Sequence, residues 1–156
     1  MVKQLTVKEV LEKAIGKEVE ARLFYTSLSR KTKQAAAKDA LKELAKEEHG
    51  HQNLLERYLR GELAGGSLSQ GELVDYKIAE CLDQPAMSAD MALKDVFLVA
   101  ANREMASHEF YRSLAGIHPG GAVRTVLEDL AAQELKHKQR VEFLYTEVAF
   151  PQTAGG

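Results

Sequence analysis

Cysteine, proline and tryptophan are scarce in this sequence of 156 residues, which has one cysteine, three prolines and no tryptophan. A single cysteine, Cys81, excludes an internal disulfide and any metal site made of Cys-x-x-Cys pairs, and it suits a reducing compartment. The formal net charge of −2 does not predict the basic surface that nucleic acid or an anionic membrane requires. We therefore expect neither nucleic acid nor a membrane among the partners.

Long apolar runs are also missing. None approaches the roughly 18 residues that a membrane-spanning helix needs, and the N-terminal MVKQLTVKEV lacks the apolar core of a secretory signal. The sequence thus predicts a cytoplasmic protein. Its length suits a single domain, which we expect at residues 1–150, followed by a flexible tail at 151–156.

The few prolines, at 85, 119 and 151, all lie at breaks in the apolar pattern, which leaves room for long helices. Thr6 and Glu9 have the spacing of a capping box before the first helix. The connections are short, long and short, which predicts an all-α four-helix bundle with one long crossover between helices 2 and 3. The first helix is expected at about 7–30, and the second begins within 31–40 and ends at about 60. The third begins at a cap, Ser88 or Asp90, and ends at about 116, and the fourth is expected at about 122–148. A short helical piece is expected near 72–82, between the second and the third.

Two stretches of the chain recur 86 residues apart. KEVEARLFYTSLS at residue 17 resembles REMASHEFYRSLA at residue 103, and LKELAKEEHGHQNLLERYL at residue 41 resembles LEDLAAQELKHKQRVEFLY at residue 127. Within EEHGH, Glu47 and His49 do not recur. The pairs that do recur are Glu18 with Glu104, Tyr25 with Tyr111, Glu48 with Glu134, and His51 with His137.

The recurring glutamates and histidines fall on apolar helical seams. In the second and fourth helices a Glu-x-x-His pair interrupts a stripe of apolar residues at the a and d positions. In the first and third helices a single glutamate stands at about mid-length on the seam. Each helix therefore sends one carboxylate inward. The six inward residues are Glu18, Glu48, His51, Glu104, Glu134 and His137.

Four inward carboxylates need a counter-charge, because an isolated buried carboxylate is costly even after relaxation. The seams hold no lysine or arginine. Two divalent metal ions would balance the four glutamates, and such a carboxylate-rich set with one imidazole per metal suits iron or manganese better than structural zinc. The alternative is a metal-free bundle that serves as an interaction module, in which the glutamates reach water and the tyrosines are plain core aromatics. The joint pattern at one offset favours the metal site.

With these motifs the sequence resembles the ferritin-like di-iron carboxylate superfamily, and most closely its rubrerythrin branch. The resemblance implies a ferritin-like four-helix bundle that holds two iron ions, with manganese or a mixed pair also compatible with the donor set. It is carried by Glu18 with the FY at 24–25, Glu48-x-x-His51, Glu104 with the FY at 110–111, and Glu134-x-x-His137, over about residues 5–148.

The resemblance also implies a role for each residue. Two glutamates would bridge the metals, the other two would each bind one metal, each histidine would bind one iron, and two tyrosines would hydrogen-bond to the carboxylates and orient them. The bridging residues are then Glu48 and Glu134, the terminal carboxylates Glu18 and Glu104, the imidazoles His51 and His137, and the tyrosines Tyr25 and Tyr111.

Two features depart from the rubrerythrin pattern. Rubrerythrins usually carry an extra glutamate one turn after the helix-3 ligand, where this chain has Ser107, and that glutamate is tied to peroxide reduction in the family. They also usually end in a rubredoxin-like domain with two Cys-x-x-Cys pairs, which are missing from this sequence. We therefore expect electrons to come from a separate donor such as a rubredoxin.

The resemblance implies a di-iron oxidoreductase that reacts with O2 or H2O2 in oxidative-stress defence, as a homodimer. The alternative is a ferroxidase or another iron-handling protein of the same superfamily, and an organic substrate is also open. The remaining candidates are expected outside the site. His49 and His108 fall off the inward stripes, although His108 is one turn from Glu104 and a less favoured alternative places it in contact with that ligand. His118 precedes a proline, and Cys81 lies in the crossover.

Overall fold

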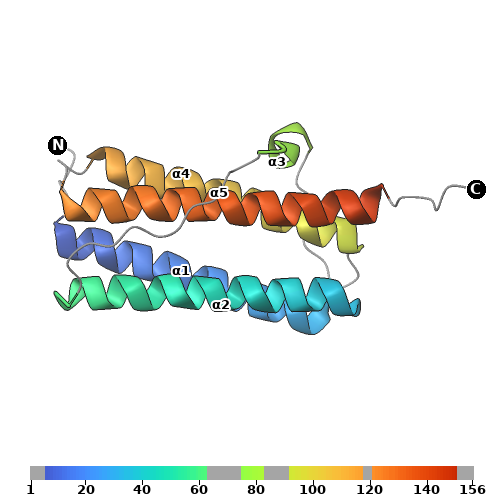
Figure 1. Ribbon diagram of the computed structural model, residues 1–156, viewed down its shortest axis with the longest axis horizontal. Helices are drawn as coiled ribbons and strands as arrows, with labels where there is room; N and C mark the ends of the chain where they lie inside the picture. Colours follow the sequence, from blue (N-terminus) through green and yellow to red (C-terminus); the bar gives the residue numbers. More distant parts are fainter. Residues whose placement is uncertain (1–5, 63–74, 83–91, 118–120, 151–156) are drawn as a thin grey trace, which may run out of the picture. The chain divides into compact units, whose positions relative to one another are not determined.

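The computed structural model describes residues 6–62, 75–82, 92–117 and 121–150. These residues form helices and no strand (Figure 1). The four long helices and the short helix in the crossover agree with the sequence prediction, whereas the caps proposed at Ser88 or Asp90 and the tail at 151–156 lie outside the described residues. The helices are α1 (Val7–Lys31), α2 (Ala35–Leu59), α3 (Ile78–Cys81), α4 (Leu93–Ile117) and α5 (Ala122–Ala149).

The ends of α1 and α2 follow from local chemistry. At the start of α1, Thr6 Oγ1 accepts a hydrogen bond from Glu9 N at 3.1 Å, and Thr6 N donates to Glu9 Oε2 at 2.8 Å. This is the predicted capping box. At the end of α2, Gly61 has a φ of 73° and its N–H bonds to Tyr58 O, while Glu62 N bonds to Arg57 O. This pair of bonds is a Schellman cap, which favours glycine at the left-handed position.

The chain divides into two compact units. Unit 1 comprises Met1–Leu68 and Tyr111–Leu130, and unit 2 comprises Ser69–Phe110 and Ala131–Gly156. Helices α1 and α2 belong to unit 1, α3 belongs to unit 2, and α4 and α5 each contribute residues to both. The single domain predicted over residues 1–150 stays a prediction.

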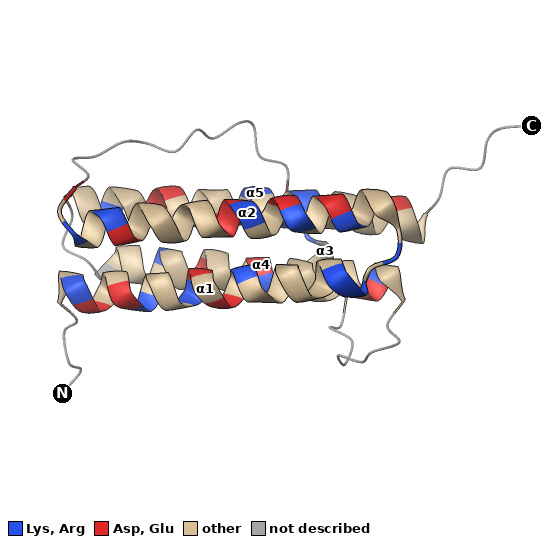
Figure 2. Ribbon diagram, turned by 90° about the horizontal axis from the view of Figure 1, so that it is seen from below, with Lys and Arg blue, Asp and Glu red and all other residues tan. Residues whose placement is uncertain are grey.

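In unit 1, α1 and α2 lie side by side, because only residues 32–34 separate them in sequence (Figure 1). Their apolar seams are buried against each other and include Leu11 and Leu28 of α1 and Leu41 and Leu44 of α2. Burial of each such side chain stabilises the fold by about 1.5–3 kcal/mol. Basic and acidic residues are interspersed along both helices (Figure 2). Among the described residues, no helix has the length and apolar character needed to cross a membrane.

In unit 2, α4 and α5 are joined by a hydrogen bond between a side chain and the backbone. His108 Nδ1 lies 2.6 Å from the carbonyl oxygen of Ala131, so its Nδ1–H donates to that oxygen. Phe97 and Ala100 of α4 and Val141 of α5 are fully buried apolar residues of this unit. His108 therefore links two helices.

Lys138 of α5 holds the crossover segment in unit 2. Its ammonium Nζ, almost inaccessible to solvent, lies 2.6 Å from Asp75 Oδ1, 3.0 Å from Glu80 Oε1 and 3.0 Å from Glu142 Oε2. Glu142, on the next turn of α5, also accepts a hydrogen bond from Ala79 N at 2.9 Å. We call these four side chains, Asp75, Glu80, Lys138 and Glu142, the Lys138 cluster. It attaches α3 and the residues before it to α5.

The charges of the Lys138 cluster shift its pKa values. Burial alone would raise the pKa of Asp75, but the hydrogen bonds from Lys138 Nζ and Lys77 N, with the positive charge of Lys138, lower it overall. Burial alone would lower the pKa of Lys138, but its hydrogen bonds to Asp75, Glu142 and Glu80 raise it. Both pKa shifts favour the ionised forms of Asp75 and Lys138 at neutral pH.

Acid is therefore expected to weaken this attachment. Because the folded-state pKa of Asp75 is depressed, its contribution to stability is present above its ordinary pKa and is lost as the pH falls through the folded value. The Asp75→Asn variant is expected to lose stability less steeply than the unaltered protein between about pH 5 and about pH 2. Urea unfolding at a series of pH values measures this, with Asp39→Asn on the exposed face of α2 as the control. Equal slopes for Asp75→Asn and the unaltered protein would contradict it.

Candidate metal centre

Three of the predicted ligands come together in unit 1. Glu18 of α1 and Glu48 and His51 of α2 are all buried, with exposed fractions of 1%, 0% and 6%. His51 Nδ1 lies 3.6 Å from Glu18 Oε1 and 3.8 Å from Glu48 Oε2. We call these three residues the unit 1 cluster.

The helices explain this placement. Glu48 and His51 are three residues apart, so their side chains share one face of α2. That face is the apolar seam that packs on α1, where Glu18 lies between buried Ala14 and Tyr25. Packing of the two apolar seams therefore places Glu48 and His51 of α2 beside the carboxylate of Glu18 on α1.

Unit 2 contains the matching set. Glu104 of α4 and Glu134 and His137 of α5 have exposed fractions of 2%, 2% and 0%. His137 Nδ1 lies 3.6 Å from Glu104 Oε1 and 3.4 Å from Glu134 Oε2. These three residues, the unit 2 cluster, repeat the residue types and nearly the same distances as the unit 1 cluster. The sequence repeat therefore corresponds to a structural repeat.

The donor atoms of each cluster suit a common metal ion. Within each cluster, one ligand atom per residue lies within 4.8 Å of the others. Ligand atoms held about 2.1 Å from one ion lie about 3–4 Å from each other, which is the spacing found here. Carboxylate oxygen with imidazole nitrogen is a donor set that iron and manganese accept. Both clusters are thus able to hold a metal, and the residues fit the ion that the sequence implies.

Tyr111 forms a hydrogen bond with one of these carboxylates. Its buried hydroxyl donates to Glu18 Oε1 at 2.6 Å and lies 3.4 Å from the carbonyl oxygen of Ala14, all within unit 1. The sequence predicts a hydrogen bond from Tyr111 to a carboxylate of the site, and the bond to Glu18 is present. Tyr25 is also buried, with its ring 5.3 Å from that of Phe24 in an edge-on arrangement. The orienting role of Tyr25 stays a prediction.

Residues expected outside the site mostly lie there. His49 is exposed and Glu47 is half-buried, whereas their neighbours Glu48 and His51 are buried. His108 donates a hydrogen bond from Nδ1 to Ala131 O, and its alternative role beside Glu104 stays a prediction. Cys81 is the last residue of α3, and His118 falls outside the described residues. Ser107, where rubrerythrins carry the extra glutamate, is buried.

Sequence reasoning missed Lys138 and Glu142, to which it assigned no role. A signal for them exists in the repeat, because Lys138 and Glu142 match Gln52 and Glu56 at the 86-residue offset. Gln52 Nε2 donates to Glu56 Oε1 at 3.0 Å, as Lys138 donates to Glu142. A polar pair at this position thus recurs on α2 and α5.

Comparisons with known proteins agree with this picture. The rubrerythrin family model matches residues 9–70, which contain the unit 1 cluster, and confirms the resemblance there. No curated protein matches the chain. Among solved structures, the chain is similar to a hypothetical protein from Pyrococcus furiosus, with a TM-score of 0.69 and 24% identity, over 96% of this chain and 94% of that one. The predicted fold, an all-α ferritin-like four-helix bundle with a long crossover, is confirmed.

Proposed function

We propose that this rubrerythrin-like chain holds two iron ions and reduces O2 or H2O2, in oxidative-stress defence. The observation that carries the proposal is the repetition of a buried cluster of two glutamates and one histidine in each unit. The family match covers the first cluster, and the 86-residue repeat extends the same residues to the second. Rubrerythrin-like proteins bind a di-iron centre through this residue pattern.

The proposed ligands are the six residues of the two clusters. In this proposal Glu48 and Glu134 would serve both metal ions, Glu18 and His51 would hold one of them, and Glu104 and His137 would hold the other. Ferrous iron held there would supply the electrons that reduce the oxidant, and manganese or a mixed pair is compatible with the same donors. A separate protein such as a rubredoxin would return the electrons, and we propose a cytoplasmic homodimer.

The protein residues prepare the site for this chemistry. Nδ1 of His51 and of His137 faces the carboxylates, so a neutral imidazole with its proton on Nε2 presents a lone pair to a metal there. Tyr111 holds its proton 2.6 Å from Glu18 Oε1 and so fixes the orientation of that carboxylate. The buried seams around both clusters exclude bulk water, which strengthens each electrostatic interaction.

Removal of the Tyr111 hydroxyl is expected to weaken, but not abolish, iron binding. The Tyr111→Phe variant loses the hydrogen bond to Glu18 and is expected to bind iron about 10- to 100-fold less tightly. Titration with ferrous iron against a competing chelator measures this. The control is Tyr76→Phe, which removes a hydroxyl from an exposed tyrosine. Unchanged affinity in Tyr111→Phe would show that this hydrogen bond does not support the ligand.

The proposed reaction is tested by anaerobic loading with ferrous iron, followed by mixing with O2 or with H2O2. We expect oxidant consumption that exceeds one turnover when a reductant is present. Iron that binds but does not consume either oxidant faster than free ferrous iron would overturn the proposed reaction. Gel filtration separates the ferroxidase alternative, because storage requires a large hollow shell whereas the redox proposal expects a dimer.

A further inference from the structure

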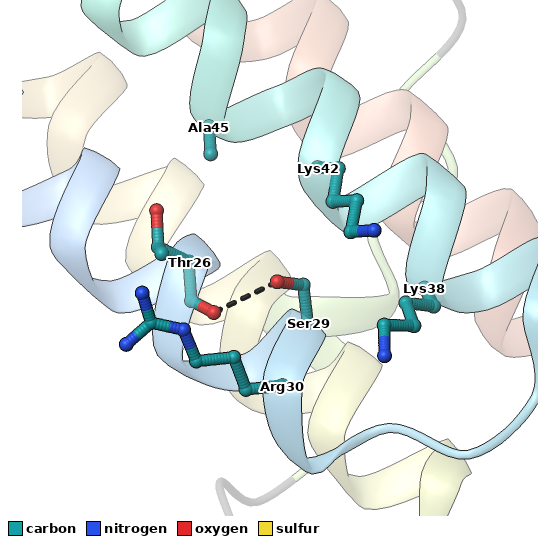
Figure 3. Close-up of a pocket in the computed structure, with 6 residues that line it drawn as sticks. All are labelled: Thr26, Ser29, Arg30, Lys38, Lys42 and Ala45. Atoms are coloured by element: carbon teal, nitrogen blue, oxygen red, sulfur yellow. Dashed lines mark hydrogen bonds between the residues drawn. The ribbon is translucent and has the colours of Figure 1, made fainter.

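A basic pocket lies in unit 1 between the end of α1 and the start of α2 (Figure 3). Its volume is about 420 Å³, within the range of small-molecule sites. Thr26, Ser29 and Arg30 line it from α1, and Lys38, Lys42 and Ala45 line it from α2. Three of its six lining residues thus carry a positive charge.

Among the described residues, these cations have no acidic partner. Within the part of the chain that the structure describes, no carboxylate forms an ion pair with Arg30, Lys38 or Lys42. The start of α2 adds to the positive potential, because its first turn holds no acidic residue and Gln34 makes no side-chain cap. The hydroxyls of Ser29 and Thr26 donate to the helix backbone, at 2.7 and 2.8 Å. Recognition in this pocket therefore rests on the cations.

The sequence repeat shows that this charge is specific to the first half. At the 86-residue offset, Lys38 and Lys42 match Arg124 and Glu128, which form an ion pair at 3.0 Å. Arg30 matches Gly116. Two lysines four residues apart on a helix repel each other, whereas the pair on α5 attracts. The repulsive pair on α2 therefore faces the pocket, whereas the equivalent pair on α5 is attractive.

We propose that this pocket binds a phosphate-type oxyanion, either free phosphate or the terminal phosphate of a larger molecule. Lysine supplies compact positive charge and arginine a planar pair of donors, which together are the side chains that bind phosphate. The volume exceeds that of one phosphate and leaves room for a group attached to it. The pocket contains none of the proposed iron ligands, so this inference is independent of the metal.

The test is isothermal titration calorimetry on the full chain at low ionic strength, with inorganic phosphate in one arm and ADP in the other. We expect saturable binding of one anion per chain that weakens as salt is added. Tighter binding of phosphate would identify a free oxyanion, and tighter binding of ADP would identify a larger phosphorylated molecule. Absence of binding in both arms would overturn the proposal.

Lys38→Glu is the sharpest variant, because it changes binding and stability in opposite directions. It removes a cation from the pocket and places a carboxylate in the first turn of α2, four residues before Lys42. We expect anion affinity to fall at least about tenfold and Tm to rise. The control is Lys13→Glu, which makes the same charge change at an exposed site about 20 Å away along α1.

The variant results separate a pocket from general charge. Affinity lost in Lys38→Glu and in Lys42→Gln, but kept in Lys13→Glu, supports the pocket. Equal losses in Lys38→Glu and Lys13→Glu would overturn it, because net charge alone would then explain binding. Unchanged affinity in both Lys38→Glu and Lys42→Gln would also overturn it.

Discussion

The Glu48→Gln variant is expected to lose its iron and to gain stability as a metal-free protein. Glu48 has no solvent exposure and lies in the unit 1 cluster with a second carboxylate, Glu18. Glutamine keeps the shape and removes the charge, so a ligand is lost. The loss of affinity is expected to exceed the about 10- to 100-fold that changes around a ligand cost. One of two neighbouring buried carboxylates also becomes neutral, which relieves their mutual repulsion and is expected to raise the free energy of unfolding of the metal-free protein.

Glu47→Gln is the matched control, because it makes the same change of charge at the neighbouring residue, which lies outside the apolar seam. Metal analysis after ferrous loading gives the iron content of both variants, and chemical unfolding in the presence of a chelator gives the stability of the metal-free protein. Glu47→Gln is expected to keep its iron. Loss of iron from both variants, or from neither, would contradict the assignment of Glu48 as a ligand.

Lys138→Met is expected to destabilise the protein by about 3–5 kcal/mol. The ammonium of Lys138 lies within 3.2 Å of three carboxylates, and Glu142 among them is completely buried. Methionine fills a similar volume but leaves the buried charge of Glu142 without its cation. Asp75 and Glu80 also lose their hydrogen bonds to α5.

Urea unfolding of Lys138→Met measures this cost, with Lys136→Met on the half-buried side of α5 as the control. The double variant Lys138→Met with Glu142→Gln is expected to recover part of the loss, since it removes the stranded charge as well. A loss below about 1 kcal/mol in Lys138→Met would show that the cluster behaves like a solvent-exposed salt bridge.

The clusters were predictable because they lie on helical seams and occur twice. Glu48 and His51 share a face by their spacing alone, and Glu134 and His137 repeat it at a constant offset. The repeat also separated Glu48 from Glu47, which lies one position away and is half-buried. Short-range periodicity and internal symmetry are both properties of the sequence, so burial of these residues could be read from it.

The Lys138 cluster and the basic pocket could not be predicted in the same way. Asp75 lies 63 residues before Lys138, and Ala79 lies 63 residues before Glu142. No periodicity relates a crossover segment to the helix on which it packs. Arg30 and Lys42 likewise line one pocket from two different helices. Long-range contacts between polar groups depend on packing that the pattern along the chain does not specify.

The most direct test of the di-iron proposal is the iron content of the full chain after anaerobic loading with ferrous iron and removal of unbound metal. The six buried donors in two matching clusters predict about two iron ions per chain. Glu48→Gln, measured alongside, is expected to hold little or none. A chain that retains no iron after this treatment would contradict the account and leave two buried clusters of glutamate and histidine with another role.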